Sequence, residues 1–183
     1  MLEQVRIGPR DRVLVLGDGK LGQLLSMLLL DQGLTVTLSG NHDRKLELAR
    51  AAGAQTCAPE ELARKSFDVV IEATGSPSGM QRALELVRPR GTLVLKSTYH
   101  GPLSFDAAPL VIDEITLVGS RCGPFAPALA SLAAGGLPVE RPCVGHHGRT
   151  VRAPHTRIPS RVNMRMQFTP FEFSSPCSSA VTR

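Results

Sequence analysis

The sequence predicts an α/β fold in which a doubly wound, six-stranded parallel sheet is followed by an irregular C-terminal tail. Six short segments are apolar throughout instead of alternating, which is typical of strands covered on both faces. Helical segments follow these strands in regular alternation, as in βαβ units. A chain of 183 residues is also long enough to bury the single core that such a sheet needs.

The first half of the domain contains three strand–helix units. Gly33 and Gly53 close the first two helices, at a position where a left-handed residue commonly ends a helix. Pro59 opens the third helix, at the first helical position that proline favours. The expected strands span 12–17, 34–39 and 54–58, and the expected helices span 20–33, 43–53 and 59–65.

The second half repeats this arrangement. Ser76 suits the N-cap of the next helix, and Pro77 suits its first helical position. Two halves of three strands each match a doubly wound sheet built from two mononucleotide-binding units. The remaining strands are expected at 67–74, 91–97 and 114–120, and the remaining helices at 76–87 and 126–136.

A change in composition near residue 139 separates a folded domain from a tail. Residues 139–183 hold seven arginines against two glutamates, which accounts for the net charge of +5. These residues also lack a sustained helical or strand period. We therefore predict a folded domain over 1–138 and an irregular, disordered tail over 139–183. The arginines are scattered, which does not favour nucleic acid as a partner.

Hydropathy and cysteine usage bound the compartment. The apolar stretches are too short to span a bilayer, and charged residues occupy the N-terminal segment where a signal peptide needs an apolar core. We expect a cytoplasmic protein with no membrane partner. The four cysteines are Cys57, Cys122, Cys143 and Cys177. They form no Cys-x-x-Cys pair, so neither a zinc site nor a disulfide framework is predicted.

A glycine pattern lies where the first strand gives way to the first helix. Gly17, Gly19 and Gly22 form G-x-G-x-x-G, the Rossmann fingerprint: a tight turn, room for a pyrophosphate, and close packing of helix on strand. The N–H groups at the helix start then face the anion. Asp18 is an awkward neighbour for a diphosphate, which Lys20 partly offsets. We predict dinucleotide binding; a glycine-rich turn that binds nothing is the alternative.

The end of the second strand bears on which dinucleotide is bound. An acidic residue there normally holds the adenosine ribose of NAD, about 20 residues after the glycine loop. Ser39 or Gly40 stands at that point, and neither has a carboxylate. We therefore predict a preference for NADP, with NAD as the alternative. Donors or charge for a 2′-phosphate would come from the next few residues: Asn41, His42, Arg44 and Lys45.

Five stretches together carry a resemblance to a known family. They are DRVLVLGDGKLG, DRKLELARAAGA, FDVVIEATGSPSG, LVRPRGTLVLKS and EITLVGSRCGPF. From Gly8 to about Gly136 the chain resembles the coenzyme-binding domain of the medium-chain dehydrogenase/reductase family, on its zinc-type alcohol, sorbitol and threonine dehydrogenase side.

The resemblance implies cofactor contacts at matching positions. It places the glycine-loop residues Gly17, Gly19, Lys20, Leu21 and Gly22 on the pyrophosphate, Gly40 at the position of the ribose acid, and Lys45 near the adenosine ribose. It places Thr74 and Gly75 against the cofactor, Lys96, Ser97 and Thr98 towards the nicotinamide ribose, and Ser120, Arg121 and Cys122 towards the carboxamide. Capping of the strand ends is the plainer interpretation of Thr74 and Ser97.

The same resemblance implies what this chain does not supply. Family members carry an N-terminal domain with the catalytic zinc ligands and proton relay, whereas Met1 stands almost at the domain boundary. We expect no family zinc and no catalytic residue in the chain. The adjacent His146 and His147 are poorly placed to bind one ion, and Tyr99 is not followed by the lysine that short-chain dehydrogenases use. Because the tail departs abruptly from the family pattern, a shifted reading frame is our hypothesis for it.

Two functions remain open at the level of sequence. In the first, the chain is the coenzyme half of an alcohol or polyol dehydrogenase and needs a separate zinc-binding catalytic domain as its partner. In the second, it is a non-catalytic remnant or sensor that binds NAD(P). In either case an exposed strand at 114–120 would favour a homodimer through the sheet edge. The substrate is not predicted.

Overall fold

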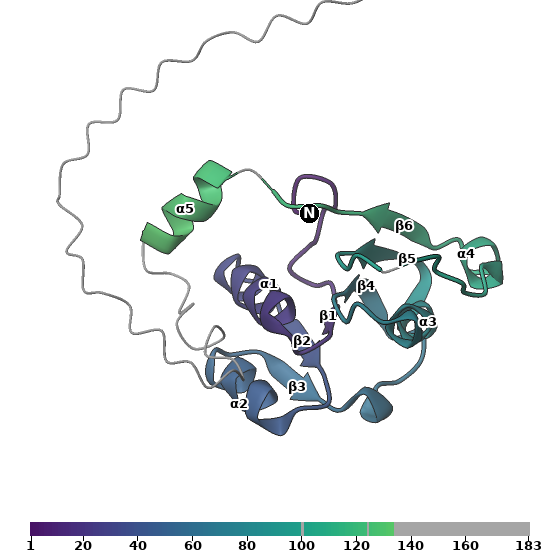
Figure 1. Cartoon of the computed structure of the whole chain (residues 1–183), viewed down its shortest axis with the longest axis horizontal. Coiled ribbons are helices and arrows are strands. Elements are labelled where there is room, and N and C mark those ends of the chain that lie inside the picture. Colours follow the sequence, from purple (N-terminus) through teal and green to yellow (C-terminus); the bar gives the residue numbers. More distant parts are fainter. Residues whose placement is uncertain (100, 124, 134–183) are drawn as a thin grey trace, which may run out of the picture. The chain divides into compact units, whose positions relative to one another are not determined.

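The structure is a computed structural model that describes residues 1–99, 101–123 and 125–133. The six predicted strands form one all-parallel sheet in the order β3-β2-β1-β4-β5-β6, which confirms the doubly wound prediction (Figure 1). The predicted tail over 139–183 lies outside the described residues. The strands are β1 (Val13–Leu16), β2 (Val36–Ser39), β3 (Gln55–Cys57), β4 (Phe67–Glu72), β5 (Val87–Leu95) and β6 (Thr116–Gly119).

The apolar runs fold into the centre of the sheet because both faces are covered. Val13 and Val15 of β1 pack into one hydrophobic cluster, whereas Leu14 and Leu16 pack into another on the opposite face. Helices α1 (Lys20–Asp31) and α2 (Asp43–Ala51) contribute to the first cluster, and α3 (Pro77–Leu86) contributes to the second. A strand buried on both faces therefore needs no polar alternation.

The predicted helix ends are found. Gly33 has a φ of +74° just after α1, where its N–H donates to the carbonyl of Leu30. The Ser76 hydroxyl accepts a hydrogen bond from the N–H of Gly79 at 3.0 Å, so it caps α3 as expected. None of the helices in the described part of the chain has the length and apolar character needed to cross a bilayer.

Two elements differ from the sequence-based boundaries. The helix expected over 59–65 is only a single 3-10 turn (Pro59–Glu61), because Leu62 then adopts an extended conformation and is buried in the second cluster. The fifth strand begins at Val87, four residues early, where Val87 pairs with Phe67. Two further helices are α4 (Ala108–Ile112), which was not predicted, and α5 (Phe125–Ala133).

The parallel register brings the carboxyl ends of the strands to one edge. Leu16 pairs with both Ser39 and Glu72, and Leu95 pairs with both Glu72 and Gly119. The loops that follow β1, β2, β4, β5 and β6 therefore begin side by side. In an open α/β sheet this edge is where ligands bind.

Candidate dinucleotide-binding site

The glycine loop after β1 is tightly packed at two of its three glycines. Gly17 has a φ of +120°, and a Cβ on it would collide with the carbonyl of Ala73 after β4. A Cβ on Gly22 would overlap the carbonyl oxygen of Gly17. These two contacts fix the turn and press α1 against the sheet, as the sequence predicts.

The middle glycine is the opposite case. Gly19 is the N-cap of α1, and nothing lies within 4 Å of the position that its Cβ would take. The first N–H groups of a helix have no partner within the helix, and the helix dipole favours an anion beside them. The loop thus combines a rigid turn with an open cradle of N–H donors, which fits a diphosphate.

Asp18 turns away from this cradle and towards the end of β2. Its Oδ2 accepts hydrogen bonds at 2.8 Å from both the backbone N–H and the ring Nδ1 of His42. Its Oδ1 lies 3.4 Å from the Lys45 Nζ. The concern that this carboxylate stands beside a diphosphate therefore does not apply, because its charge is paired with the segment after β2.

The pKa of Asp18 is lowered despite its burial. Burial by itself would raise the pKa, since it disfavours the charged form. The hydrogen bonds from the side chain and backbone of His42, together with the positive charge of Lys45, outweigh that effect. The group is a carboxylate at neutral pH.

Gly40 and Asp18 fit together at the end of β2. A Cβ on Gly40 would overlap the side chain of Asp18, so only glycine fits there. Sequence reasoning found no acid at this strand end, yet the structure places one there from the glycine loop. No sequence pattern reports this; it follows from the strand register, in which Leu16 pairs with Ser39 and the residues that follow each of them lie side by side.

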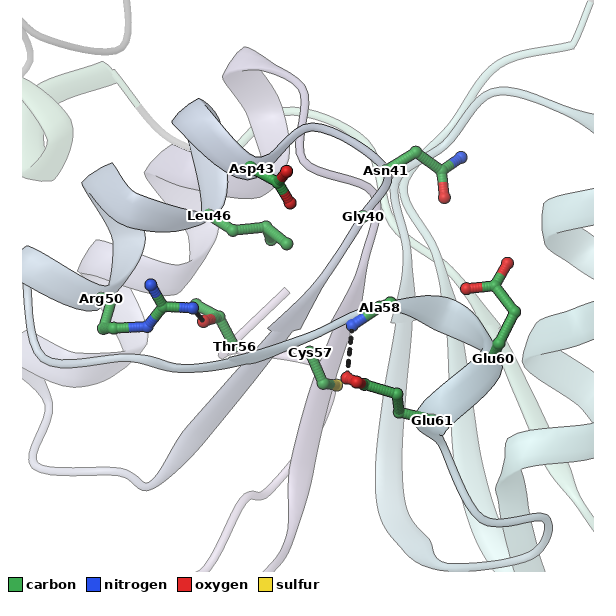
Figure 2. Close-up of a pocket in the computed structure, with 10 residues that line it drawn as sticks. All are labelled: Gly40, Asn41, Asp43, Leu46, Arg50, Thr56, Cys57, Ala58, Glu60 and Glu61. Atoms are coloured by element: carbon green, nitrogen blue, oxygen red, sulfur yellow. Dashed lines mark hydrogen bonds between the residues drawn. The ribbon is translucent and has the colours of Figure 1, made fainter.

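A hollow of about 360 Å³ opens beside Gly40, between the ends of β2 and β3 and the first turns of α2. Figure 2 shows Leu46 and Asp43 on its α2 side and Glu60 and Glu61 on the opposite side. The Arg50 guanidinium in its wall donates to the Thr56 hydroxyl at 2.7 Å. Three carboxylates against one arginine give the lining an acidic character.

Comparison with known proteins identifies the family. The sequence profile described as zinc-binding dehydrogenase matches residues 21–134, more than half of the chain. The chain belongs to the zinc-binding dehydrogenase family. Its fold is that of the coenzyme-binding region of such enzymes.

Curated dehydrogenases match over part of their length. D-arabinitol dehydrogenase 1 of Uromyces fabae is 32% identical over 136 residues, which cover 65% of this chain and 39% of that protein. Glucose 1-dehydrogenase of Thermoproteus tenax is 39% identical over 101 residues, which cover 52% of this chain and 29% of that protein. The chain therefore spans less than half the length of these relatives.

Solved structures of dehydrogenases share the fold. L-idonate 5-dehydrogenase of Escherichia coli superposes with a TM-score of 0.63 at 29% identity, over 69% of this chain and 40% of that one. A zinc-binding dehydrogenase of Sinorhizobium meliloti, whose structure contains NADP, superposes with a TM-score of 0.69 at 25% identity, over 76% of this chain and 46% of that one.

A buried carboxylate at the end of β4 was missed by sequence reasoning. Glu72 is fully buried, and its Oε1 accepts hydrogen bonds from the N–H and the hydroxyl of Thr74 at 2.7 and 2.5 Å. Its Oε2 accepts the phenol proton of Tyr99 at 2.6 Å. Three donors compensate for burying this charge. Glu72 thus holds the loops after β4 and β5, which carry residues expected near the cofactor.

The remaining predicted residues of this zinc-binding dehydrogenase domain also lie on loops at this edge. The Gly75 N–H donates to the Ser97 hydroxyl at 2.9 Å, and the Lys96 Nζ donates to the Arg121 carbonyl at 2.9 Å. Ser120, after β6, is buried, and its hydroxyl has no partner among the described residues. A buried hydroxyl without a hydrogen-bond partner at a strand end is consistent with a polar group of a ligand binding there.

The family name implies zinc, and the described residues do not fit it. Within the three described ranges, no three side chains of histidine, cysteine, aspartate or glutamate come together as metal ligands do. The pair at His146 and His147 lies outside those ranges. We derive no chemical step through a metal.

Proposed function

We propose that this chain is the dinucleotide-binding part of an NAD(P)-dependent dehydrogenase of the alcohol or polyol class. The observation that carries the proposal is the glycine loop. There is no space for a side chain at Gly17 or Gly22, whereas the space beside Gly19 is empty. A loop that only needed to turn tightly would not require the open position at the helix N-terminus.

Each strand end has a role in this proposal. The N–H groups after Gly19 bind the diphosphate, and the β2 end with Gly40 and Asn41 receives the adenosine ribose. The Ser97 and Thr98 segment after β5 orients the nicotinamide ribose, and the Ser120 hydroxyl bonds the carboxamide, which would satisfy its orphaned oxygen. Bound NAD(P) supplies the hydride acceptor, and the protein positions it.

NADP is the preferred cofactor in this proposal. His42 and Lys45 stay 59% and 38% exposed at the end of β2, where a 2′-phosphate would lie. The acidic hollow beside Gly40 would repel that phosphate, so the phosphate belongs on the His42 side of the strand end. The S. meliloti relative contains NADP and other solved relatives contain NADH or NAD, so this preference rests on the residues of the chain itself.

Gly19→Val tests dinucleotide binding without disturbing the fold. The valine enters open space but is a poorer N-cap than glycine, at a cost of about 1 kcal/mol, so the thermal midpoint should fall by no more than about 6 °C. Binding of NADPH, followed by its fluorescence, should weaken at least about tenfold, because the methyl groups fill the diphosphate cradle. The chain contains no tryptophan, so its own emission does not interfere.

Gly8→Ala is the control, because a Cβ there makes only an ordinary contact, 3.6 Å from the Asp11 carboxylate, and Gly8 precedes β1, outside every strand-end loop assigned to the cofactor. It should bind NADPH as tightly as the unchanged chain. Equal affinities of the Gly19 variant and the control would contradict the proposal.

Alcohol oxidation tests the second half of the proposal. The full chain should reduce NADP⁺ with secondary alcohols or polyols only when a polypeptide carrying a zinc-binding catalytic domain is added. Dinucleotide binding without oxidation under both conditions would favour the non-catalytic NAD(P)-binding module, which is the second candidate function.

A further inference from the structure

Three side chains meet where the glycine loop touches the segment after β2. Asp18 comes from the loop, and His42 and Lys45 come from the start of α2. The Asp18 side chain is 8% exposed, whereas the His42 side chain is mostly exposed and the Lys45 side chain partly so. The acid is therefore the buried member of the cluster, and the two bases form its outer surface.

Two roles are open to an acid at this strand end. It can accept hydrogen bonds from the adenosine ribose hydroxyls, as acids at the end of the second strand do. That role would favour NAD. It can instead hold neighbouring bases in place for a 2′-phosphate. The two roles predict opposite effects on cofactor preference when the carboxylate is removed.

The contacts of Asp18 favour the second role. Oδ2 already accepts two hydrogen bonds from His42 at 2.8 Å, and Oδ1 faces the His42 ring at 3.1 Å and the Lys45 ammonium at 3.4 Å. With so little of its surface exposed, Asp18 has little access to a ribose. Three donors, the His42 N–H, the His42 Nδ1–H and the Lys45 ammonium, therefore occupy most of the roughly four acceptor positions of the carboxylate.

The bases keep donors for a ligand. Because the His42 Nδ1 faces the carboxylate, Nε2 is the ring nitrogen left over, and it has no hydrogen-bond partner in the part of the chain that the structure describes. The Lys45 ammonium has three donors, and Asp18 takes one of them. The buried Gln23 amide also donates to the Lys45 carbonyl at 2.8 Å, which fixes the backbone that carries this lysine.

We infer that Asp18 is a positioning residue for NADP: it orients His42 and Lys45 so that both bind the 2′-phosphate. The inference rests on the proposed dinucleotide function and deepens it. It assigns the selectivity of the site to a residue of the glycine loop, through two bases that the loop holds. An acid thereby favours the cofactor that carries the extra negative charge.

The experiment measures dissociation constants of NADPH and NADH for the full chain and for Asp18→Asn. Asparagine keeps the size of the side chain and loses the charge that holds both bases. The preference for NADPH over NADH should fall by about tenfold, the usual weight of one charge-assisted hydrogen bond. Displacement by adenosine 2′,5′-bisphosphate should weaken in parallel, whereas displacement by 5′-AMP should not.

His42→Gln and Lys45→Gln should each lower the same preference, and combining either with Asp18→Asn should add little further loss. Arg10→Gln is the matched control, because it removes a positive charge from an exposed position before β1, outside every segment assigned to the cofactor. The ratio of NADPH affinity to NADH affinity in this control variant should stay within about twofold of that of the unchanged chain.

The outcomes separate cleanly. If the preference for NADPH rises in Asp18→Asn, Asp18 repels the phosphate. If the affinities for both cofactors fall equally, Asp18 only supports the loop. Either result overturns the inference. An unchanged ratio also overturns it. If the unchanged chain binds neither cofactor, the proposed function itself fails, and that result is visible before any variant is made.

Discussion

Gly40 has no space for a side chain, because Asp18 occupies the volume next to its Cα. Sequence reasoning interpreted this glycine as a missing acid and Asp18 as an awkward one. Both interpretations treated the two residues separately, whereas the structure shows them as one packed pair. The glycine pattern could be recognised from spacing alone, but the direction of the Asp18 side chain depends on a contact between residues 22 positions apart.

Gly40→Ala should destabilise the chain by about 1–3 kcal/mol, the usual cost of overpacking a closed site. The added methyl overlaps the side chain of Asp18 and must displace it from His42. Urea unfolding followed by circular dichroism measures the change. Gly119→Ala, where a Cβ meets nothing, should change stability by less than about 0.5 kcal/mol. Equal stabilities of the two variants would contradict the packed pair.

At the scale of elements, the order of strands and helices could be predicted and their lengths could not. Continuous apolar runs identify strands buried on both faces, and glycine and proline mark their ends. The segment at 59–65 has helix-forming residues, but burying Leu62 requires an extended chain there. The five-residue α4 is too short to show a helical period. Tertiary burial decided the first case, and no local pattern reports it; α4 buries no residue and was missed because of its length.

The loop after β5 is tied to β4 through Tyr99 and Glu72, and a titration can follow this link. Burial raises the pKa of the Tyr99 phenol, and its hydrogen bond to Glu72 and the charge of that carboxylate raise it further. The neutral phenol therefore contributes stability up to the pKa of the unfolded chain, about 10, and this contribution is lost as pH rises through the higher pKa of the folded state.

Tyr99 is the single tyrosine of the chain, so ultraviolet absorbance reports on it alone. We expect the phenol to titrate at higher pH in the folded chain than in the same chain in urea. Coincident titration curves would show that the link between the two strand ends does not form in solution.

At the scale of the whole molecule, acid should unfold the domain by breaking a few specific pairs. Burial would raise the pKa of Asp68, but its bonds to Arg88 and to the Arg12 backbone and their positive charges lower it, and the pKa of Asp18 is lowered as well. Their contribution to stability is complete above the unfolded pKa of about 3.9 and disappears as pH falls through the lower pKa values of the folded state.

Asp68→Asn should therefore be less stable than the unchanged chain at neutral pH, and the difference should shrink below about pH 4. Urea unfolding at a series of pH values measures it. Asp31→Asn, at an exposed position with no ion pair among the described residues, should show no such difference. A constant gap between Asp68→Asn and the unchanged chain at every pH would contradict the assignment.

The sheet ends at β6, where Leu117 is 37% exposed, and Val111 and Ile112 of the neighbouring α4 are more exposed still. We predict a homodimer through this edge, because an unpaired strand beside apolar side chains favours pairing with another copy. Leu117→Lys should shift the chain to monomer in sedimentation, whereas Glu47→Lys on α2 should not. A monomeric unchanged chain would refute the prediction.

The interlocking of Asp18 with Gly40 also restricts how this site can change over generations or under redesign. An acid at position 40, directly after the strand, cannot be introduced by one substitution, because any side chain there meets Asp18 first. The two substitutions must occur in a fixed order. Replacing Asp18 by a smaller residue opens the space, and only then can the side chain of Gly40→Asp be accommodated. If position 40 changes first, the intermediate protein is strained. An acid at position 18 can therefore be exchanged for one at position 40 only when Asp18 is replaced first.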